Sequence, residues 1–181
     1  MLSLTVTQII RYYHNFMNAL HKDSNHHAAS EQSVTHTEHQ QVELSKSVGA
    51  LVFNQHLHVL LIFQQKNRYW EYPKGKVEAG EREFDTLRRE IFEETGIQHF
   101  HLVKGFRKSM YYDFHYKGRL IRRKVVYYLM TTRDRVRISK EHARYAWLPA
   151  DRAKKRLKHQ NQIVLIDEAI KRIRDEQQSQ R

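Results

Sequence analysis

The chain has 181 residues, a net charge of +12 and no cysteine, so it is long enough for one domain with an extension and cannot form disulfides, thiolate metal sites or a cysteine nucleophile. No segment is long and apolar enough to cross a membrane, and residues 1–20 lack the basic start and unbroken apolar run of a signal peptide. We therefore expect a cytoplasmic protein that makes no membrane contact.

The first 44 residues divide into two segments. Apolar side chains recur at helical spacing between Thr5 and Leu20, and Thr5 with Gln8 matches a capping box, so residues 1–20 are predicted to hold an amphipathic helix. Residues 21–44 are rich in His, Ser, Gln and Thr and show no apolar periodicity, which predicts a polar linker.

A globular domain is predicted over residues 45–175, and its first half begins with strands. Residues 47–54 and 57–63 are apolar and β-branched with a short turn between them, which predicts a β-hairpin. Residues 84–95 have the composition of a helix, and Gly96 is expected to end that helix in the left-handed conformation.

The second half of the domain alternates strand and helix patterns. Strands are predicted at residues 100–107, 109–116, 120–132 and 144–148, with Lys117 and Gly118 forming a turn. Helices are predicted at residues 150–157 and 162–174, and residues 176–181 read as a polar tail. Strands mixed with helices predict an α/β protein in which helices cover a mixed β-sheet.

Acidic residues at fixed spacing mark the predicted helix at residues 84–95. Glu90, Glu93 and Glu94 are spaced i, i+3 and i+4, so their carboxylates share one face, where each pair of like charges costs several tenths of a kcal/mol. A divalent cation would reverse the sign of that interaction. Hard oxygen ligands in a chain without cysteine indicate Mg²⁺ or Mn²⁺. Leu87 and Ile91 lie on the opposite side and are expected to pack against the sheet.

Three further residues stand at fixed distances from these glutamates. Gly75 lets the backbone approach a metal ion or a phosphate without a side chain in the way. Arg89 is expected to orient Glu93 or Glu81 through bidentate hydrogen bonds and so to hold the carboxylates in place.

The complete pattern over residues 75–97, G-x5-E-x7-R-E-U-x-E-E-x-G-U with U apolar, resembles the Nudix box. That box marks enzymes that hydrolyse a nucleoside diphosphate linked to another moiety. The resemblance covers about residues 45–175 and implies an α/β/α sandwich with a mixed β-sheet, preceded in this chain by the N-terminal helical extension.

The resemblance also implies roles for individual residues. Glu90 and Glu94 would ligate the cation, with Glu93 as a further ligand and the Lys74 carbonyl as a backbone one. A metal-activated water would attack a phosphorus atom in line. The base that takes its proton would be a glutamate of the box or Glu141 in the loop before the last strand. The predicted catalytic residues are Arg89, Glu93, Glu94 and Glu141.

Three motifs outside the box resemble the asymmetrical type of diadenosine tetraphosphate hydrolase. They are W-x-[FY]-P-K-G at residues 70–75, K-x-V-x-Y at residues 124–128 and S-x-E-H-x-x-Y-x-W-L at residues 139–148. The implied substrate is a dinucleoside tetraphosphate, and the implied products are ATP and AMP. The resemblance therefore narrows the expected chemistry to one branch of the family.

Substrate contacts are predicted in three groups. Gly75 and four cations would meet the phosphates, the cations being Lys74, Lys76, Arg107 and Lys124. Tyr112 and Tyr116 fall on one strand face and would stack on adenine. His142 and Tyr145 match the family's loop motif and would line the nucleotide pocket.

The charge distribution leaves alternatives open. Residues 1–44 hold two basic and four acidic side chains, so the excess positive charge lies on the predicted domain, where it suits a polyphosphate or an RNA 5′ end. An RNA 5′-end pyrophosphohydrolase and a diphosphoinositol polyphosphate hydrolase are therefore alternatives. A third is a non-catalytic Nudix module that binds a nucleotide and regulates a partner through the helix at residues 5–20. The sequence predicts no oligomeric state.

Overall fold

The computed structural model describes residues 42–179, so the predicted helix at residues 5–20 and nearly all of the predicted linker lie outside the described residues. The described elements, in chain order, are β1 (Glu43–Phe53), β2 (Val59–Gln64), β3 (Tyr69–Glu71), β4 (Lys74–Lys76), α2 (Glu83–Thr95), β5 (His101–Tyr116), β6 (Arg119–Thr131), β7 (His142–Leu148), α3 (Ala150–Arg156) and α4 (Gln160–Ser179).

The strands form one mixed β-sheet. Their order is β3-β2-β1-β6-β5, with β4 also paired to β1 and β7 also paired to β2. β1 and β6 run parallel along their length, from Glu43↔Ile121 to Phe53↔Thr131, and the other pairs are antiparallel. The predicted hairpin of β1 and β2 is present, but it pairs only Phe53 with Val59, because β6 and β4 occupy the edges of β1.

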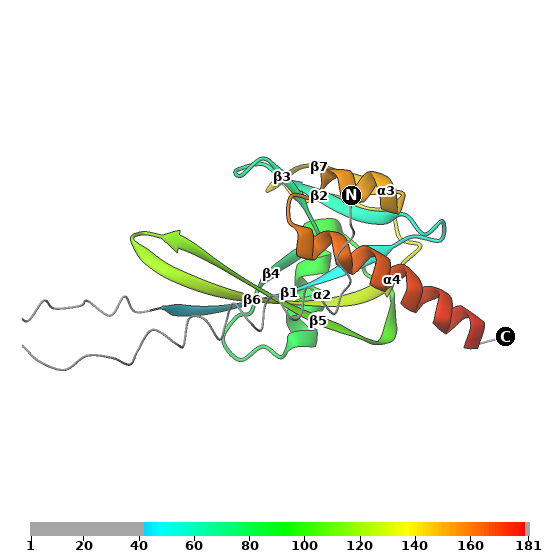
Figure 1. The fold of residues 1–181 in the computed structure, drawn as a ribbon, viewed down its shortest axis with the longest axis horizontal. Helices are drawn as coiled ribbons and strands as arrows, with labels where there is room; N and C mark the ends of the chain where they lie inside the picture. Colours follow the sequence, from blue (N-terminus) through cyan, green and yellow to red (C-terminus); the bar gives the residue numbers. More distant parts are fainter. Residues whose placement is uncertain (1–41, 180–181) are drawn as a thin grey trace, which may run out of the picture. The chain divides into compact units, whose positions relative to one another are not determined.

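Helices cover both faces of this sheet (Figure 1). On one side, called the α2 face here, Leu87 and Ile91 of α2 pack against Val48 and Leu60, which confirms their predicted burial. On the other side, called the α4 face, α3 and α4 cover a larger apolar cluster that includes Tyr72 and Tyr127. Because side chains alternate along a strand, β1, β2 and β6 each contribute to both clusters, which gives the predicted α/β arrangement.

The strand predicted to break near Lys108 is instead continuous. β5 runs from His101 to Tyr116, and its irregularity is a register shift between Leu102 and Arg107, where Gly105 has a φ of +76°. A glycine accommodates that φ without strain, which makes it the natural site of a bulge. The predicted turn at Lys117 and Gly118 is confirmed, and both residues have positive φ, as a tight hairpin turn requires.

Two boundaries differ from the prediction. β1 begins at Glu43, two residues before the expected start of the domain, and α4 runs to Ser179 instead of ending near residue 174. No glycine or proline interrupts the end of α4, and the Lys171–Asp175 ion pair supports its last turns. Among the described residues, no helix is long and apolar enough to span a bilayer.

Candidate active site

Helix α2 presents its acidic residues on the side away from its buried stripe. Thr86, Leu87, Ile91 and Thr95 are buried, and Gly96 ends the helix in the left-handed conformation with a φ of 71°. The predicted helix and its predicted end are therefore confirmed. Glu90, Glu93 and Glu94 are left facing β4 and the loop before α2.

Gly75 lies directly against the Glu90 carboxylate. β4 pairs with β1 in the register Val48↔Gly75, and a Cβ atom added to Gly75 would overlap the carboxylate of Glu90. A close approach was predicted between the Gly75 backbone and a metal ion or a phosphate. In this structure the group that approaches Gly75 is the carboxylate of Glu90. Burial raises the pKa of Glu90, because an ionised carboxylate is poorly solvated there.

Arg89 links the acidic residues into one network. Its Nε and Nη2 donate to the two oxygens of Glu81 at 2.7 and 2.9 Å, and its Nη1 donates to Glu90 at 2.7 Å and to Glu93 at 3.1 Å. Nη2 also donates to the Lys76 carbonyl at 3.0 Å. The two hydrogen bonds from Arg89 to Glu81 are the main reason that the pKa of Glu81 is held down at about 2. The predicted hydrogen bonding of Arg89 is confirmed, and its contribution to catalysis stays a prediction.

Glu94 is nearly buried, with 13% of its side chain exposed, and it accepts a hydrogen bond of 2.7 Å from the Lys74 amide. Burial raises the pKa of Glu94 to about 8, against the smaller opposing effect of Lys74. A buried carboxylate that lacks compensating positive charge binds a proton or a cation readily.

The Lys74 ammonium contacts a second buried carboxylate. Its Nζ lies 2.6 Å from Glu71 Oε2, and only 2% of the Glu71 side chain is exposed. Burial alone would lower the pKa of Lys74, but Glu71, Tyr127 and Glu94 together more than offset this, so the pKa is raised. The ammonium is therefore held inside the protein by Glu71. The predicted phosphate contact would require the ammonium to point to solvent, which it does not do. Sequence reasoning missed Glu71, whose only signal is one acid in the aromatic run of residues 69–72.

The loop before β7 brings His142 to the carboxylates. Ser139 and Arg137 donate backbone N–H bonds to the carbonyls of Glu94 and Thr95, which fixes this loop on the end of α2. The His142 side chain is 1% exposed, and its Nε2 lies 3.6 Å from Glu94 Oε1 without a hydrogen-bond partner among the described residues. Burial lowers the pKa of His142, so the ring is neutral at neutral pH. Glu141, the predicted loop base, is exposed beside it.

The remaining predicted contacts fall on different faces of the sheet. The register pairs Tyr112 with Arg123 and Tyr116 with Arg119, on the same face as Tyr127, which is the α4 face. Lys76 is exposed on β4, and Tyr145 is exposed on β7.

Arg107 and Lys124 were predicted to share one phosphate path with Lys74 and Lys76, and the register places these two cations on the α2 face instead. Arg107 is also paired with Glu83 at 2.6 Å. The four predicted cations therefore do not converge in this structure.

The donor atoms fit a hard divalent cation, although they are not gathered around one point. Among residues 42–179, no three acidic or histidine side chains converge as a metal-binding group. Glu90 and Glu93 are turned towards Arg89, whereas Glu94 is buried and its pKa is raised. Carboxylate oxygens are the ligands that Mg²⁺ and Mn²⁺ prefer, so the residues present suit these ions.

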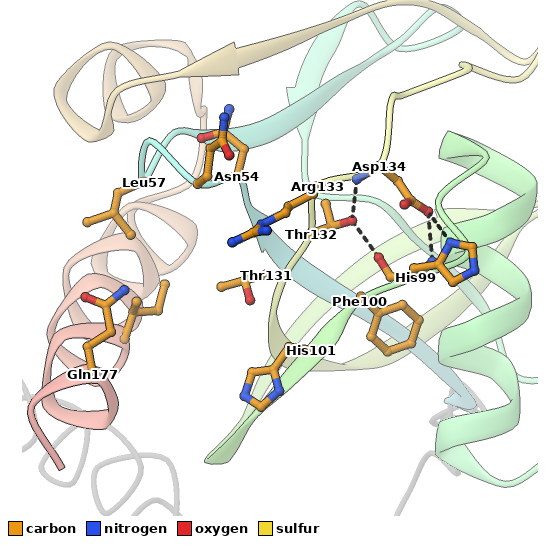
Figure 2. A pocket seen from close by; sticks show the side chains of 12 residues that line it. Asn54, Leu57, His99, Phe100, His101, Thr131, Thr132, Arg133, Asp134 and Gln177 are labelled. Carbon is orange, nitrogen blue, oxygen red and sulfur yellow. Dashed lines mark hydrogen bonds and ion pairs between the residues drawn. The ribbon is translucent and has the colours of Figure 1, made fainter. Parts of the chain in front are cut away.

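A separate hollow of about 660 Å³ lies where β1 and β6 end and β5 begins (Figure 2). Arg133 extends into it, and His101, Leu57 and Gln177 lie around it. Thr132 Oγ1 donates to the His99 carbonyl at its edge. None of the signature glutamates lines this hollow, so it is distinct from the candidate active site.

Comparison with known proteins assigns the family. A profile of the NUDIX domain matches residues 43–168, more than half of the chain. The chain belongs to the Nudix family. This confirms the predicted family and the predicted hydrolase class. The matched region begins at the first residue of β1 and includes every signature residue.

Relatives of this Nudix protein carry two kinds of names. The rat bis(5′-nucleosyl)-tetraphosphatase [asymmetrical] is 32% identical over 123 residues, which cover 60% of this chain and 81% of the relative. The RNA pyrophosphohydrolase of Bartonella bacilliformis is 32% identical over 78 residues, which cover 38% of this chain and 46% of the relative. The crystal structure of a C. elegans Ap4A hydrolase binary complex matches with a TM-score of 0.59 at 23% identity, covering 68% of this chain and 93% of that chain. The last match shows a shared fold.

Proposed function

We propose that this Nudix hydrolase cleaves a phosphoanhydride bond of dinucleoside polyphosphates and converts diadenosine tetraphosphate to ATP and AMP. The observation that carries the proposal is the position of His142. This residue belongs to the motif that resembles the asymmetrical tetraphosphatases, and its Nε2 lies 3.6 Å from Glu94 Oε1. A motif that resembles those tetraphosphatases thus lies beside a signature carboxylate. The name of the rat relative, matched over 81% of its length, supports the same substrate.

We propose Mg²⁺ or Mn²⁺ as the cofactor, held by Glu90, Glu93 and Glu94 with the Lys74 carbonyl as a backbone ligand. When bound, such a cation neutralises phosphate oxygens and lowers the pKa of a water molecule. The raised pKa of Glu94 supports this assignment, because a buried carboxylate that nearby positive charge does not fully compensate gains most from a cation.

The protein's own residues position the reaction. Arg89 keeps Glu81, Glu90 and Glu93 at fixed distances from one another, so little reorganisation is needed when substrate binds. A water in line with the phosphorus atom must lose its proton. Glu141 is the candidate base outside the helix, because it lies in an exposed loop fastened to the end of α2.

Nucleotide recognition is proposed on the α4 face. Tyr112 and Tyr116 offer exposed rings for adenine, and His142 and Tyr145 of β7 would line the nucleotide pocket. Gly75 and Lys76 border the phosphate path. Arg107 and Lys124 have no part in this proposal because they lie on the α2 face.

RNA with a 5′ triphosphate is a second candidate substrate. Five of the eight residues from 117 to 124 are Lys or Arg and none is acidic, which suits a polyanion longer than a dinucleotide. The RNA pyrophosphohydrolase names among the relatives support it as well.

We also propose that the reaction takes place in the cytoplasm. Among the described residues, no helix is long and apolar enough to span a membrane.

The test is product analysis with the full chain. Diadenosine tetraphosphate, triphosphorylated RNA and a diphosphoinositol polyphosphate are each incubated with Mg²⁺ or Mn²⁺, in water enriched in ¹⁸O. We expect ATP and AMP from the dinucleotide, with the label in only one of the two products. Turnover of the RNA or the inositol compound with none of the dinucleotide would overturn the substrate, and turnover of none with either metal would overturn the enzymatic proposal.

A further inference from the structure

The far part of the β5–β6 hairpin, residues 111–124, is called the distal hairpin here. Its strands continue past the helices, and the connecting turn at Lys117 and Gly118 is tight (Figure 1). On the β6 side it pairs with β1 only from Ile121 onward. The tip therefore stands clear of the cores that stabilise the domain, so its side chains are available for contacts outside it.

Positive charge on the distal hairpin exceeds what the described acidic residues compensate. Arg122 is paired with Asp113 at 2.8 Å, and Arg119 approaches Glu43 only to 3.6 Å. Within residues 42–179, no acidic side chain forms an ion pair with Lys117, Arg123 or Lys124. Uncompensated cations on a projecting strand pair form a site for a polyanion.

Aromatic rings alternate with these cations. Arg123 lies 4.7 Å above the Phe114 ring, Lys117 lies 5.5 Å from the Tyr116 ring and Lys124 lies 5.7 Å from the Tyr111 ring. Tyr111 is 59% exposed, although burying a ring of this size would be favourable. A cation beside an exposed ring is the arrangement that binds a phosphate and an adjacent base together.

A hollow of about 260 Å³ surrounds Tyr111 on the α2 face. Three cations line it, together with Leu44 and Ser45 of β1; they are Lys46, Arg122 and Lys124. This face is opposite to the one proposed for adenine in the hydrolytic site. The hollow is thus an additional site of suitable chemistry for one base with its flanking phosphates.

We propose that the distal hairpin binds single-stranded RNA, with a base stacked on Tyr111 in this hollow and backbone phosphates on the cations of the hairpin. The proposal is independent of the proposed diadenosine tetraphosphate activity, because its stacking ring, Tyr111, lies on the α2 face and has no part in the proposed hydrolytic site.

RNA fits this surface better than a membrane or an acidic protein does. Tyr111 lies on one face of the distal hairpin and Tyr116 on the other. A flat bilayer would meet only one of these faces, whereas a flexible strand can follow both. An acidic protein would satisfy the cations and would leave the exposed rings without a matching π surface.

Binding is measured by fluorescence anisotropy, using the full chain and a labelled single-stranded RNA with a 5′ hydroxyl, in EDTA. The missing 5′ phosphates and the chelator keep hydrolysis out of the measurement. We expect Tyr111→Ala to weaken binding about tenfold, which is the size expected for one lost stacking contact. Tyr111→Phe keeps the ring and should bind as the unaltered chain does.

Charge reversal at the tip of the distal hairpin tests the phosphate contacts independently of the stacking contact. The slope of log affinity against log salt is negative, and each phosphate contact on a single strand contributes about 0.7 to its size. Lys117→Glu with Arg119→Glu should therefore make the slope shallower by roughly 1.4. The matched control is Lys155→Glu with Lys158→Glu, which makes the same change in net charge at exposed positions on and after α3. This control should keep most of the slope.

The proposal is overturned if Tyr111→Ala binds RNA as the unaltered chain does, or if the control pair reduces the slope as much as the tip pair. Tighter binding to vesicles with anionic headgroups than to RNA, or to single-stranded DNA than to RNA, would also overturn it. Turnover of diadenosine tetraphosphate is followed in parallel, and it should be unchanged in Tyr111→Ala. Failure of RNA binding is therefore distinguishable from failure of the proposed hydrolysis.

Discussion

Two glutamates on helix α2, eleven residues apart, have opposite electrostatic surroundings. Glu83 accepts hydrogen bonds from Arg107 at 2.6 and 2.9 Å and from the Tyr128 hydroxyl at 2.7 Å, and Lys46 lies 2.8 Å away. The Arg107 hydrogen bonds hold the pKa of Glu83 well below its usual range. Glu94 accepts one backbone amide, and burial raises its pKa to about 8.

The contrast separates a structural carboxylate, Glu83, from the proposed metal ligand, Glu94. Glu83 is fully compensated, so a cation would gain little there, and its role is to fasten the start of α2 to β1, β5 and β6. Glu94 is buried without an equivalent partner, which destabilises the folded protein unless a proton or a cation is bound. A divalent ion would supply what the protein leaves out at that end of the helix.

The largest effect is expected from a substitution of Glu94. Glu94→Gln should lower the rate of phosphoanhydride hydrolysis roughly a thousandfold, equivalent to about 4 kcal/mol of transition-state stabilisation. The neutral amide resembles the protonated form that burial already favours, so the fold should persist. Steady-state turnover and the circular dichroism melt measure the two effects, and an active Glu94→Gln protein would contradict the role given to this carboxylate.

Arg89→Lys tests whether the guanidinium network positions the carboxylates. A lysine cannot make the bidentate contact with Glu81 while also reaching Glu90 and Glu93. We expect activity and Mn²⁺ affinity to fall by about 10- to 100-fold, as for other residues that orient metal ligands. Arg88→Lys, one position earlier on the helix, is the matched control and should retain both. Equal losses in the two variants would show that the effect is not specific to the network.

Glu83→Gln tests the other member of the comparison. It leaves Arg107 and Lys46 without their carboxylate, and 19% of the Glu83 side chain is exposed. We expect a loss of about 1–2 kcal/mol in the free energy of unfolding, the usual cost of removing a charged hydrogen-bond partner. Urea denaturation measures it. Turnover per folded molecule should stay near that of the unaltered chain, and a large drop in turnover would assign Glu83 to the active site.

The last prediction concerns the pH dependence of stability. The pKa of Glu94 is raised from 4.5 to about 8 in the folded state, so the folded protein binds a proton that the unfolded chain has released. Its contribution to stability is therefore fully present below pH 4.5 and is lost as the pH rises towards 8. In EDTA, the free energy of unfolding should fall over this window by up to about 1.4 kcal/mol per pH unit relative to Glu94→Gln. Parallel pH profiles for the two proteins would contradict the assigned pKa.

Local features of the site were predictable from sequence. The bounds of α2, the left-handed Gly96 and the hydrogen bonds from Arg89 to Glu81 all depend on spacing within residues 75–97. Helix geometry alone fixes which side chains share a face, so the burial of Leu87 and Ile91 followed as well.

Features that depend on strand register were not predictable. Arg107 falls on the α2 face because a bulge between Leu102 and Arg107 resets which residues of β5 face each side. Lys124 falls on that face because it alternates in step with Val126 and Met130 of β6, and the sequence does not say which side of the sheet α2 covers. The Glu71–Lys74 pair was missed for a related reason. Sequence alternation cannot say whether Glu71 points inward until β3 is placed against β2.

The most direct test of the central claim is Mn²⁺ binding, measured by electron paramagnetic resonance at pH 7.5 on the unaltered chain, Glu94→Gln and Glu83→Gln. We predict that Glu83→Gln binds Mn²⁺ as the unaltered chain does, while Glu94→Gln binds it far more weakly. Undiminished binding in Glu94→Gln, or loss of binding in Glu83→Gln, would contradict the division of roles along α2.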